Sequence, residues 1–92
     1  MPEPIWITGC GVVSAIGLDK RECLQALLEE RSGVGAVRYL QTEHAEFPVG
    51  EVKLSNAEMR ERLGIPQDAL TTRTSLMGML ALQETLADAQ MT

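Results

Sequence analysis

The sequence predicts an α/β fold that begins with a strand, a glycine-rich loop and a helix. Residues 5–8 are β-branched or aromatic, which is typical of a buried strand. Three glycines follow within a short stretch, Gly9, Gly11 and Gly17, and glycine allows neighbouring backbone to come close. A helical pattern of apolar residues begins after Asp19. Together, these three observations indicate the first strand, loop and helix of an α/β fold.

The length and composition leave room for one small domain and exclude several functions. The chain has 92 residues, of which 45% are hydrophobic and 23% charged, so disorder is not expected. Its net charge of −5 and the absence of a Lys/Arg cluster argue against binding to nucleic acid or to an anionic membrane. No stretch has the roughly 20 apolar residues of a membrane span, and no signal peptide is visible. We therefore expect a cytoplasmic protein whose two cysteines stay reduced.

The first helix is expected over residues 20–30, with Asp19 as its N-cap. The apolar stripe of this helix is made of Cys23, Leu24, Leu27 and Leu28. A Ser-Gly-Val-Gly sequence ends the helical pattern, and Gly33 stands near the place of a left-handed C-terminal cap. This helix should therefore pack one face against the core.

The middle of the chain predicts a loop, a short strand and a short helix. Residues 36–48 show no clean period, and residues 41–48 are expected to form a surface loop. Residues 49–53 are expected to form a short strand near a sheet edge, since the proline before them cannot donate a hydrogen bond. Ser55 and Glu58 have the spacing of a capping box, which predicts a short helix that ends at Gly64. We expect this helix to be mostly solvated.

The longest element is a helix expected over residues 72–89. One apolar face of it consists of Leu76, Met79, Leu82, Leu86 and Ala89. Residues 77–82 carry no charge on any side, which is typical of a buried helix. The small residues Gly78, Ala81 and Ala87 should allow close approach of a neighbouring helix or sheet.

The expected strands are too few to complete a sheet. One buried strand leaves backbone groups unpaired, and stable sheets need three or more strands. We therefore expect residues 1–92 to be a single incomplete segment, the first part of a larger domain.

The motifs that could carry chemistry give little support to a catalytic site. Gly9 and Gly11 follow a strand as in a dinucleotide-binding loop, but Ser14 stands where the third glycine is needed. A phosphate-binding P-loop is excluded because no Gly-Lys-Ser/Thr follows. Cys10 is expected to be a small buried residue, and His44, the only histidine, a surface loop residue. We predict no catalytic residue, no cofactor and no metal site within the chain.

Five pieces of the sequence, taken in order, resemble one known family. They are residues 7–17, 26–28, 31–34 and 50–52, followed by Arg73, Ala81, Glu84, Leu86, Asp88 and Ala89 in the long helix. The residues that form its structural signature are Thr8, Gly9, Gly11, Ser14, Gly17, Ser32 and Gly33. This pattern resembles the N-terminal part of the β-ketoacyl-acyl carrier protein synthases, condensing enzymes of the thiolase-like superfamily.

The resemblance implies a five-layered α-β-α-β-α fold, usually in a dimer. It also implies acyl transfer and decarboxylative Claisen condensation of acyl and malonyl thioesters, in fatty acid or polyketide synthesis. The family uses a cysteine at the start of a buried helix and two histidines. Neither Cys10 nor Cys23 matches that nucleophile motif. The chain would then be a scaffold segment without activity of its own: strand, glycine loop, helix, short strand, short helix and long buried helix.

The partner that the resemblance implies is an acyl carrier protein, which is acidic. Family members often carry basic residues just before the long helix, but residues 67–72 have none. The candidate carrier contacts are then Arg60, Arg62 and Arg73, whose ordinary interpretation is solvated surface charge. The long helix departs from the family twice, with Thr85 where alanine is usual and Gln90 where glycine is usual.

Three alternatives remain open at this point. Within the same family, a chain-length-factor type subunit keeps the fold and lacks the catalytic cysteine. From a different class, the chain could be a self-contained small α/β interaction module. A small nucleotide-binding protein is the weakest alternative, because the glycine spacing does not match its fingerprint.

Overall fold

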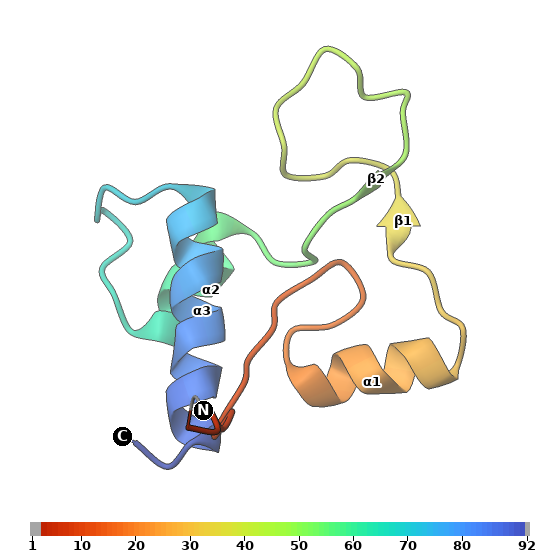
Figure 1. The fold of residues 1–92 in the computed structure, drawn as a ribbon. Helices are drawn as coiled ribbons and strands as arrows, with labels where there is room; N and C mark the ends of the chain where they lie inside the picture. The colour runs from red at the N-terminus through yellow and green to blue at the C-terminus, as the bar shows by residue number, and fades with distance from the viewer. Residues whose placement is uncertain (1–2, 92) are drawn as a thin grey trace.

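The computed structural model describes residues 3–91, which form three helices and a two-stranded sheet (Figure 1). In chain order these elements are α1 (Lys20–Leu28), β1 (Val34–Gly35), β2 (Val49–Gly50), α2 (Asn56–Leu63) and α3 (Arg73–Asp88). β1 and β2 are antiparallel, with Val34 opposite Gly50 and Gly35 opposite Val49. β2 covers only the first two residues of the strand expected over 49–53. The mixed α/β class is confirmed, while the thiolase-like fold stays a prediction.

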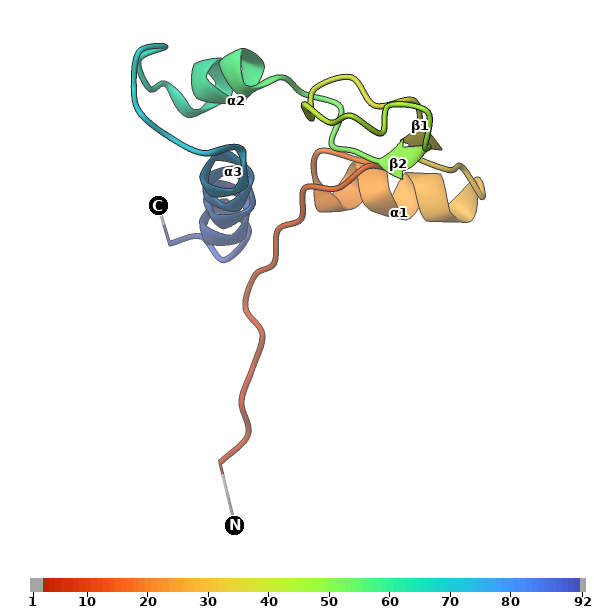
Figure 2. The same cartoon turned by 90° about the horizontal axis from the view of Figure 1, so that it is seen from above.

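The elements form two groups, one on each side of the N-terminal segment. α2 packs against α3, and β1 and β2 lie beside α1 on the other side of the N-terminal segment (Figure 1). Figure 2 shows that segment extending away from both groups. The radius of gyration is 15.6 Å, against about 12 Å for a compact domain of this length. The described residues therefore have an open arrangement.

The core is a small cluster between α2, α3 and the segment before α2. Its buried members are Val52, Leu54, Met59 and Leu76. The half-buried residues packed against them are Val13, Leu18, Leu63, Ile65, Met77 and Leu80. Our expectation that α2 is mostly solvated is wrong in one respect, because Met59 is fully buried. α2 is an amphipathic helix whose one apolar face meets α3.

The helix starts follow the local signals of the sequence. Asp19 caps α1 by accepting the backbone N–H of Glu22 at 2.8 Å. Ser55 accepts the N–H of Glu58 at 3.1 Å, and the Glu58 carboxylate accepts the N–H of Ser55 at 3.1 Å. This reciprocal pair is the predicted capping box. Thr72 caps α3 through its side chain.

The helices end at residues in the left-handed conformation. Gly64 ends α2 as predicted, with a φ of 72°. The expectation for α1 is wrong, because the left-handed residue is Glu30, with a φ of 56°, rather than Gly33. Gly33 lies in the following loop, where a Cβ would overlap the carbonyl oxygen of Ala15. α3 is followed by Gln90, with a φ of 59°.

The strand expected over residues 5–8 is absent from the described structure. These residues are extended but belong to no strand. Ile5, Trp6 and Ile7 are 95%, 79% and 88% exposed. The physical reason is that no other described segment lies alongside to pair with them. Residues 5–8 therefore have the sequence pattern of a buried strand, but they are not buried in the described structure.

Two further apolar faces are open to solvent. On α1, Cys23 is buried as expected, and so is Ala26. The rest of the predicted stripe is exposed, namely Leu24, Leu27 and Leu28. On α3, Leu76 is buried but Met79 and Leu82 are exposed, so the expectation of a helix buried all round is wrong for this chain. Among residues 3–91, no helix is long and apolar enough to cross a membrane.

Candidate functional site

The glycine loop lies directly on the backbone of α3. A Cβ atom at Gly9 would stand 2.6 Å from the carbonyl oxygen of Thr85, and one at Gly11 would overlap the carbonyl oxygen of Ala81. The Cβ of Ala89 also faces Gly9. Ala81, Thr85 and Ala89 are four residues apart, so they share one side of the helix. This close approach accounts for glycine at both positions.

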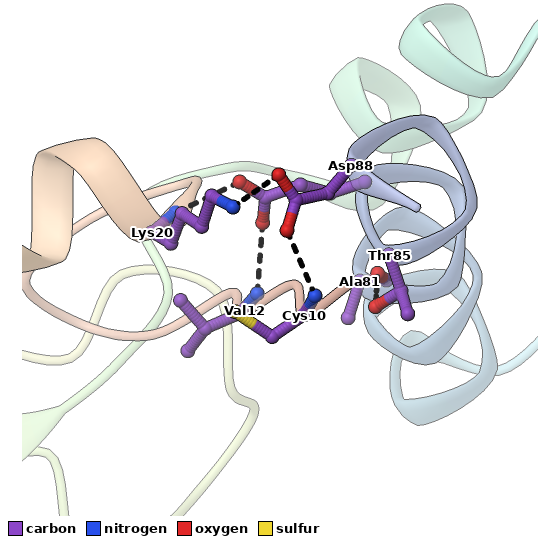
Figure 3. A network of polar contacts seen from close by, with 7 residues as sticks. Cys10, Val12, Lys20, Ala81, Thr85 and Asp88 are labelled. Atoms are coloured by element: carbon purple, nitrogen blue, oxygen red, sulfur yellow. Dashed lines mark hydrogen bonds and ion pairs between the residues drawn. The ribbon is translucent and has the colours of Figure 1, made fainter. Parts of the chain in front are cut away.

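Two carboxylates of α3 bind the backbone of the same loop. The N–H of Cys10 donates to Asp88 Oδ2 at 3.1 Å, and the N–H of Val12 donates to Glu84 Oε1 at 2.8 Å. Figure 3 shows these two donors side by side, both pointing at the helix. Thr85 Oγ1 donates to the carbonyl of Ala81 at 2.8 Å. The hydroxyl of Thr85 therefore has its hydrogen-bond partner within α3, next to the place where the glycine loop contacts the helix.

The same carboxylates also hold the start of α1. The second oxygen of Glu84 accepts the backbone N–H of Lys20 at 2.9 Å. The ammonium of Lys20 forms an ion pair with Asp88 (Figure 3). This side-chain bond to Lys20, followed by the N–H of Cys10, lowers the pKa of Asp88 below its usual value. The bond to Asp88 likewise raises the pKa of Lys20. Glu84 and Asp88 therefore join the glycine loop, α1 and α3.

The rest of the glycine loop is a tight turn against α1. The N–H of Ser14 donates to the carbonyl of Gly17 at 2.9 Å. Ser14 Oγ lies 3.2 Å from the Sγ of Cys23 and accepts the N–H of Ile16 at 3.3 Å. Gly17 is buried, and a Cβ there would stand 2.6 Å from the backbone nitrogen of Cys23. The turn therefore fits closely onto the first turns of the helix.

The remaining signature residues lie at the periphery of this contact. Thr8 is exposed, in the extended segment. Ser32 is exposed, and its hydroxyl oxygen accepts the N–H of Val34 at 3.1 Å. Gly33 packs on the carbonyl of Ala15, in the tight turn of the glycine loop. Thr8 and Ser32 are thus the exposed members of the seven signature residues.

Glu51 organises the long loop between β1 and β2. Its carboxylate accepts the backbone N–H groups of three successive residues, Arg38, Tyr39 and Leu40, at 2.8–3.2 Å. Desolvation acts to raise the pKa of Glu51, but these three hydrogen bonds outweigh it and hold the pKa below its usual value. The carboxylate therefore ties the start of the loop to the end of β2.

The three arginines predicted as carrier contacts differ in their surroundings. Arg73 is half-buried and donates to the carbonyl of Val52 at 2.9 Å and to Asn56 at 3.1 Å. Its guanidinium also lies 5.1 Å from the ring centroid of Tyr39. It is thus a structural contact rather than a solvated charge. The other two are on α2, where Arg60 is half-buried and Arg62 exposed.

Among the described residues, the side chains of the two cysteines and the histidine form no common site. Cys10 is exposed, so the expectation of a buried residue is wrong; the open extended segment before it leaves its side chain uncovered. Cys23 is buried as expected. His44 lies in the exposed loop near Glu46 and Phe47. Within the described range 3–91, no cluster of three metal-ligating side chains forms.

Glu84, Asp88 and Glu51 belong to the family resemblance, but no contact was predicted for them from the sequence. A signal for the first two existed in their spacing. They are four residues apart on one helix, and like charges at this spacing destabilise a helix unless each has a partner. The acidic pair on an otherwise mostly uncharged helix therefore indicated a contact with other parts of the chain. Nothing in the sequence pattern indicated the three donors around Glu51.

Comparison with known proteins adds one similarity. A 3-oxoacyl-[acyl-carrier-protein] synthase 1 from Buchnera aphidicola subsp. Baizongia pistaciae (strain Bp) is 30% identical to the chain over 87 residues. The match covers 94% of this chain and 21% of the relative, so the chain spans about a fifth of the relative's length. No protein-family model and no solved structure matches the chain. The similarity suggests the ketosynthase family.

Proposed function

We propose that the chain is the N-terminal scaffold segment of a 3-oxoacyl-acyl carrier protein synthase-like protein. The observation that carries this proposal is the contact between the glycine loop and α3. The loop and residues 81–89 are the first and last pieces of the family resemblance, and they meet in space through Gly11 and the two carboxylates of α3. The similarity to the 3-oxoacyl synthase over 87 residues supports the same proposal.

In this proposal the segment supplies framework and no chemistry. The reaction would be acyl transfer followed by decarboxylative condensation, with a cysteine and two histidines that no residue of the chain matches. The intact protein would be a cytoplasmic dimer with a thiolase-like fold, and residues 5–8 would be a strand of its sheet. Their exposure of 79–95% at three apolar residues supports a missing partner for this strand.

Docking of an acyl carrier protein is a further part of the proposal. The guanidinium of Arg73 is already bound to Val52 and Asn56, so the contact with an acidic carrier would fall mainly on Arg62, which is exposed on α2. Arg62→Glu in the intact protein should then raise the KM for the carrier-bound substrate and leave kcat unchanged. An unchanged KM would argue against docking at α2.

Fragment complementation tests the scaffold role. The chain would be co-expressed with a 3-oxoacyl synthase from which the matching N-terminal part has been deleted. We expect the two pieces to co-purify and to restore condensation of acyl and malonyl thioesters, whereas neither piece is active alone. Gly11→Val is the matched negative variant, because its side chain cannot fit against Ala81. Arg21→Ala is the neutral control, since Arg21 is a charged residue on the exposed side of α1.

The opposite outcome would favour a self-contained module. In that case the chain would be a monomer with strong amide hydrogen-exchange protection in its helices, and it would not associate with the deleted synthase. Gel filtration and hydrogen exchange on the purified chain distinguish the two results.

A further inference from the structure

A surface cavity of about 410 Å³ lies between the glycine loop, the segment after α1 and Lys53. The signature residues that line it are Ser14, Gly17, Ser32 and Gly33. Its volume falls within the range of small-molecule sites, roughly 300–1,000 Å³. The scaffold role proposed above makes no use of this cavity.

The cavity lining has a local excess of positive charge in an acidic chain. Arg31 and Lys53 both line it, and within residues 3–91 neither is paired with a carboxylate. Lys53 Nζ donates to the carbonyl of Gly33 at 2.8 Å, which fixes the ammonium and leaves two of its three protons free. The acidic lining residue is Glu22, whose carboxylate accepts the N–H of Leu18 at 2.7 Å.

A neutral donor completes the set. Ser32 Oγ accepts the N–H of Val34 at 3.1 Å, so its own proton remains free to be donated. A guanidinium, an ammonium and a hydroxyl around one cavity suit a tetrahedral oxyanion, because a guanidinium binds two of its oxygens at once. We propose that this cavity binds a small molecule through its phosphate group, with Arg31, Lys53 and Ser32 as the donors.

The inference is tested by titrating the full chain, labelled with ¹⁵N, with inorganic phosphate, adenosine monophosphate and adenosine. We expect saturable shifts of the amide signals of Gly17, Ser32 and Gly33 with both phosphates and none with adenosine. A stronger response to the monophosphate identifies a phosphate ester as the ligand, and an equal response identifies free phosphate. Saturable binding of adenosine, or linear shifts with both phosphates, would overturn the inference.

Charge-removing variants separate the site from general salt effects. Arg31→Ala and Lys53→Ala should each weaken phosphate binding about tenfold, the usual effect of losing one hydrogen bond to a charged group. Arg21→Ala is the matched control, since it removes the same charge from the exposed side of α1 and should change the affinity less than twofold. Equal weakening in all three variants would overturn the inference. As a second readout, phosphate should raise the unfolding midpoint of the wild type more than that of the Arg31→Ala/Lys53→Ala double variant, whereas equal rises would be the general salt effect of phosphate and would overturn the inference.

Discussion

Replacing Gly11 by alanine should detach the glycine loop from α3. The new methyl group would overlap the carbonyl oxygen of Ala81, which belongs to the helix backbone and cannot move aside. Moving the loop breaks the hydrogen bonds from Val12 to Glu84 and from Cys10 to the second carboxylate. The bond to Glu84 is part-buried, and a hydrogen bond of this kind to a charged group contributes about 1.5–3 kcal/mol. The lower entropy of alanine in the unfolded chain offsets about 0.4–1 kcal/mol of that loss.

The expected net loss of unfolding free energy for Gly11→Ala is therefore about 0.5–2.5 kcal/mol. Urea unfolding followed by circular dichroism at 222 nm measures it. Gly78→Ala is the control: this glycine lies within α3 with open space around it, so alanine should stabilise the chain by about 0.5–1 kcal/mol. If Gly11→Ala left the midpoint unchanged while Gly78→Ala raised it, the close contact between loop and helix would be refuted.

Three further results are expected. The pKa of Glu51 lies below its usual 4.5 in the folded chain. The stabilisation that the ionised Glu51 gives is therefore complete above pH 4.5 and is lost as the pH falls through the lower pKa of the folded chain. Between pH 7 and pH 3, the urea midpoint should fall less steeply in Glu51→Gln than in the wild type. Gln90→Gly should stabilise the chain by about 1 kcal/mol, because its φ of 59° favours glycine, and a lower melting temperature would contradict this. Leu76→Ala, at a fully buried position, should lower the free energy of unfolding by about 2–5 kcal/mol. Leu82→Ala, at a 56% exposed position, should change it by less than about 0.5 kcal/mol. Similar losses for both variants would contradict the burial of Leu76.

The parts of the fold that the sequence predicts are those decided within a few residues. The caps at Asp19 and Ser55 depend on a side chain and a backbone group three residues away, so the pattern is sufficient. The left-handed residue after α1 was misplaced because Glu30 occupies a conformation that favours glycine, and the sequence offered Gly33 nearby. At the equivalent place after α3, the family resemblance did mark Gln90 as a position where glycine is usual.

Burial could not be predicted in the same way, because it depends on distant segments. Residues 5–8 have the composition of a buried strand, yet a strand needs neighbours that the described chain does not supply. Met59 was expected in a mostly solvated helix, because the charged residues around it dominate the sequence pattern of α2. In the structure, the narrow apolar face of α2 that contains Met59 packs on α3. The site followed the same rule: the need for glycine at position 11 could be predicted, but its partner Ala81 lies 70 residues away.

The hydrogen bond between Val12 and Glu84 also sets a delay during synthesis. The two residues are 72 positions apart, and a ribosome adds about 5–20 residues per second, so the donor waits roughly 4–14 s for its acceptor to be made. Throughout that time the apolar segment with Ile5, Trp6 and Ile7 is attached to a loop that has no helix to hold it. Nascent chains with such segments are prone to aggregate. The contact between the glycine loop and α3 therefore forms only after most of the chain has been made.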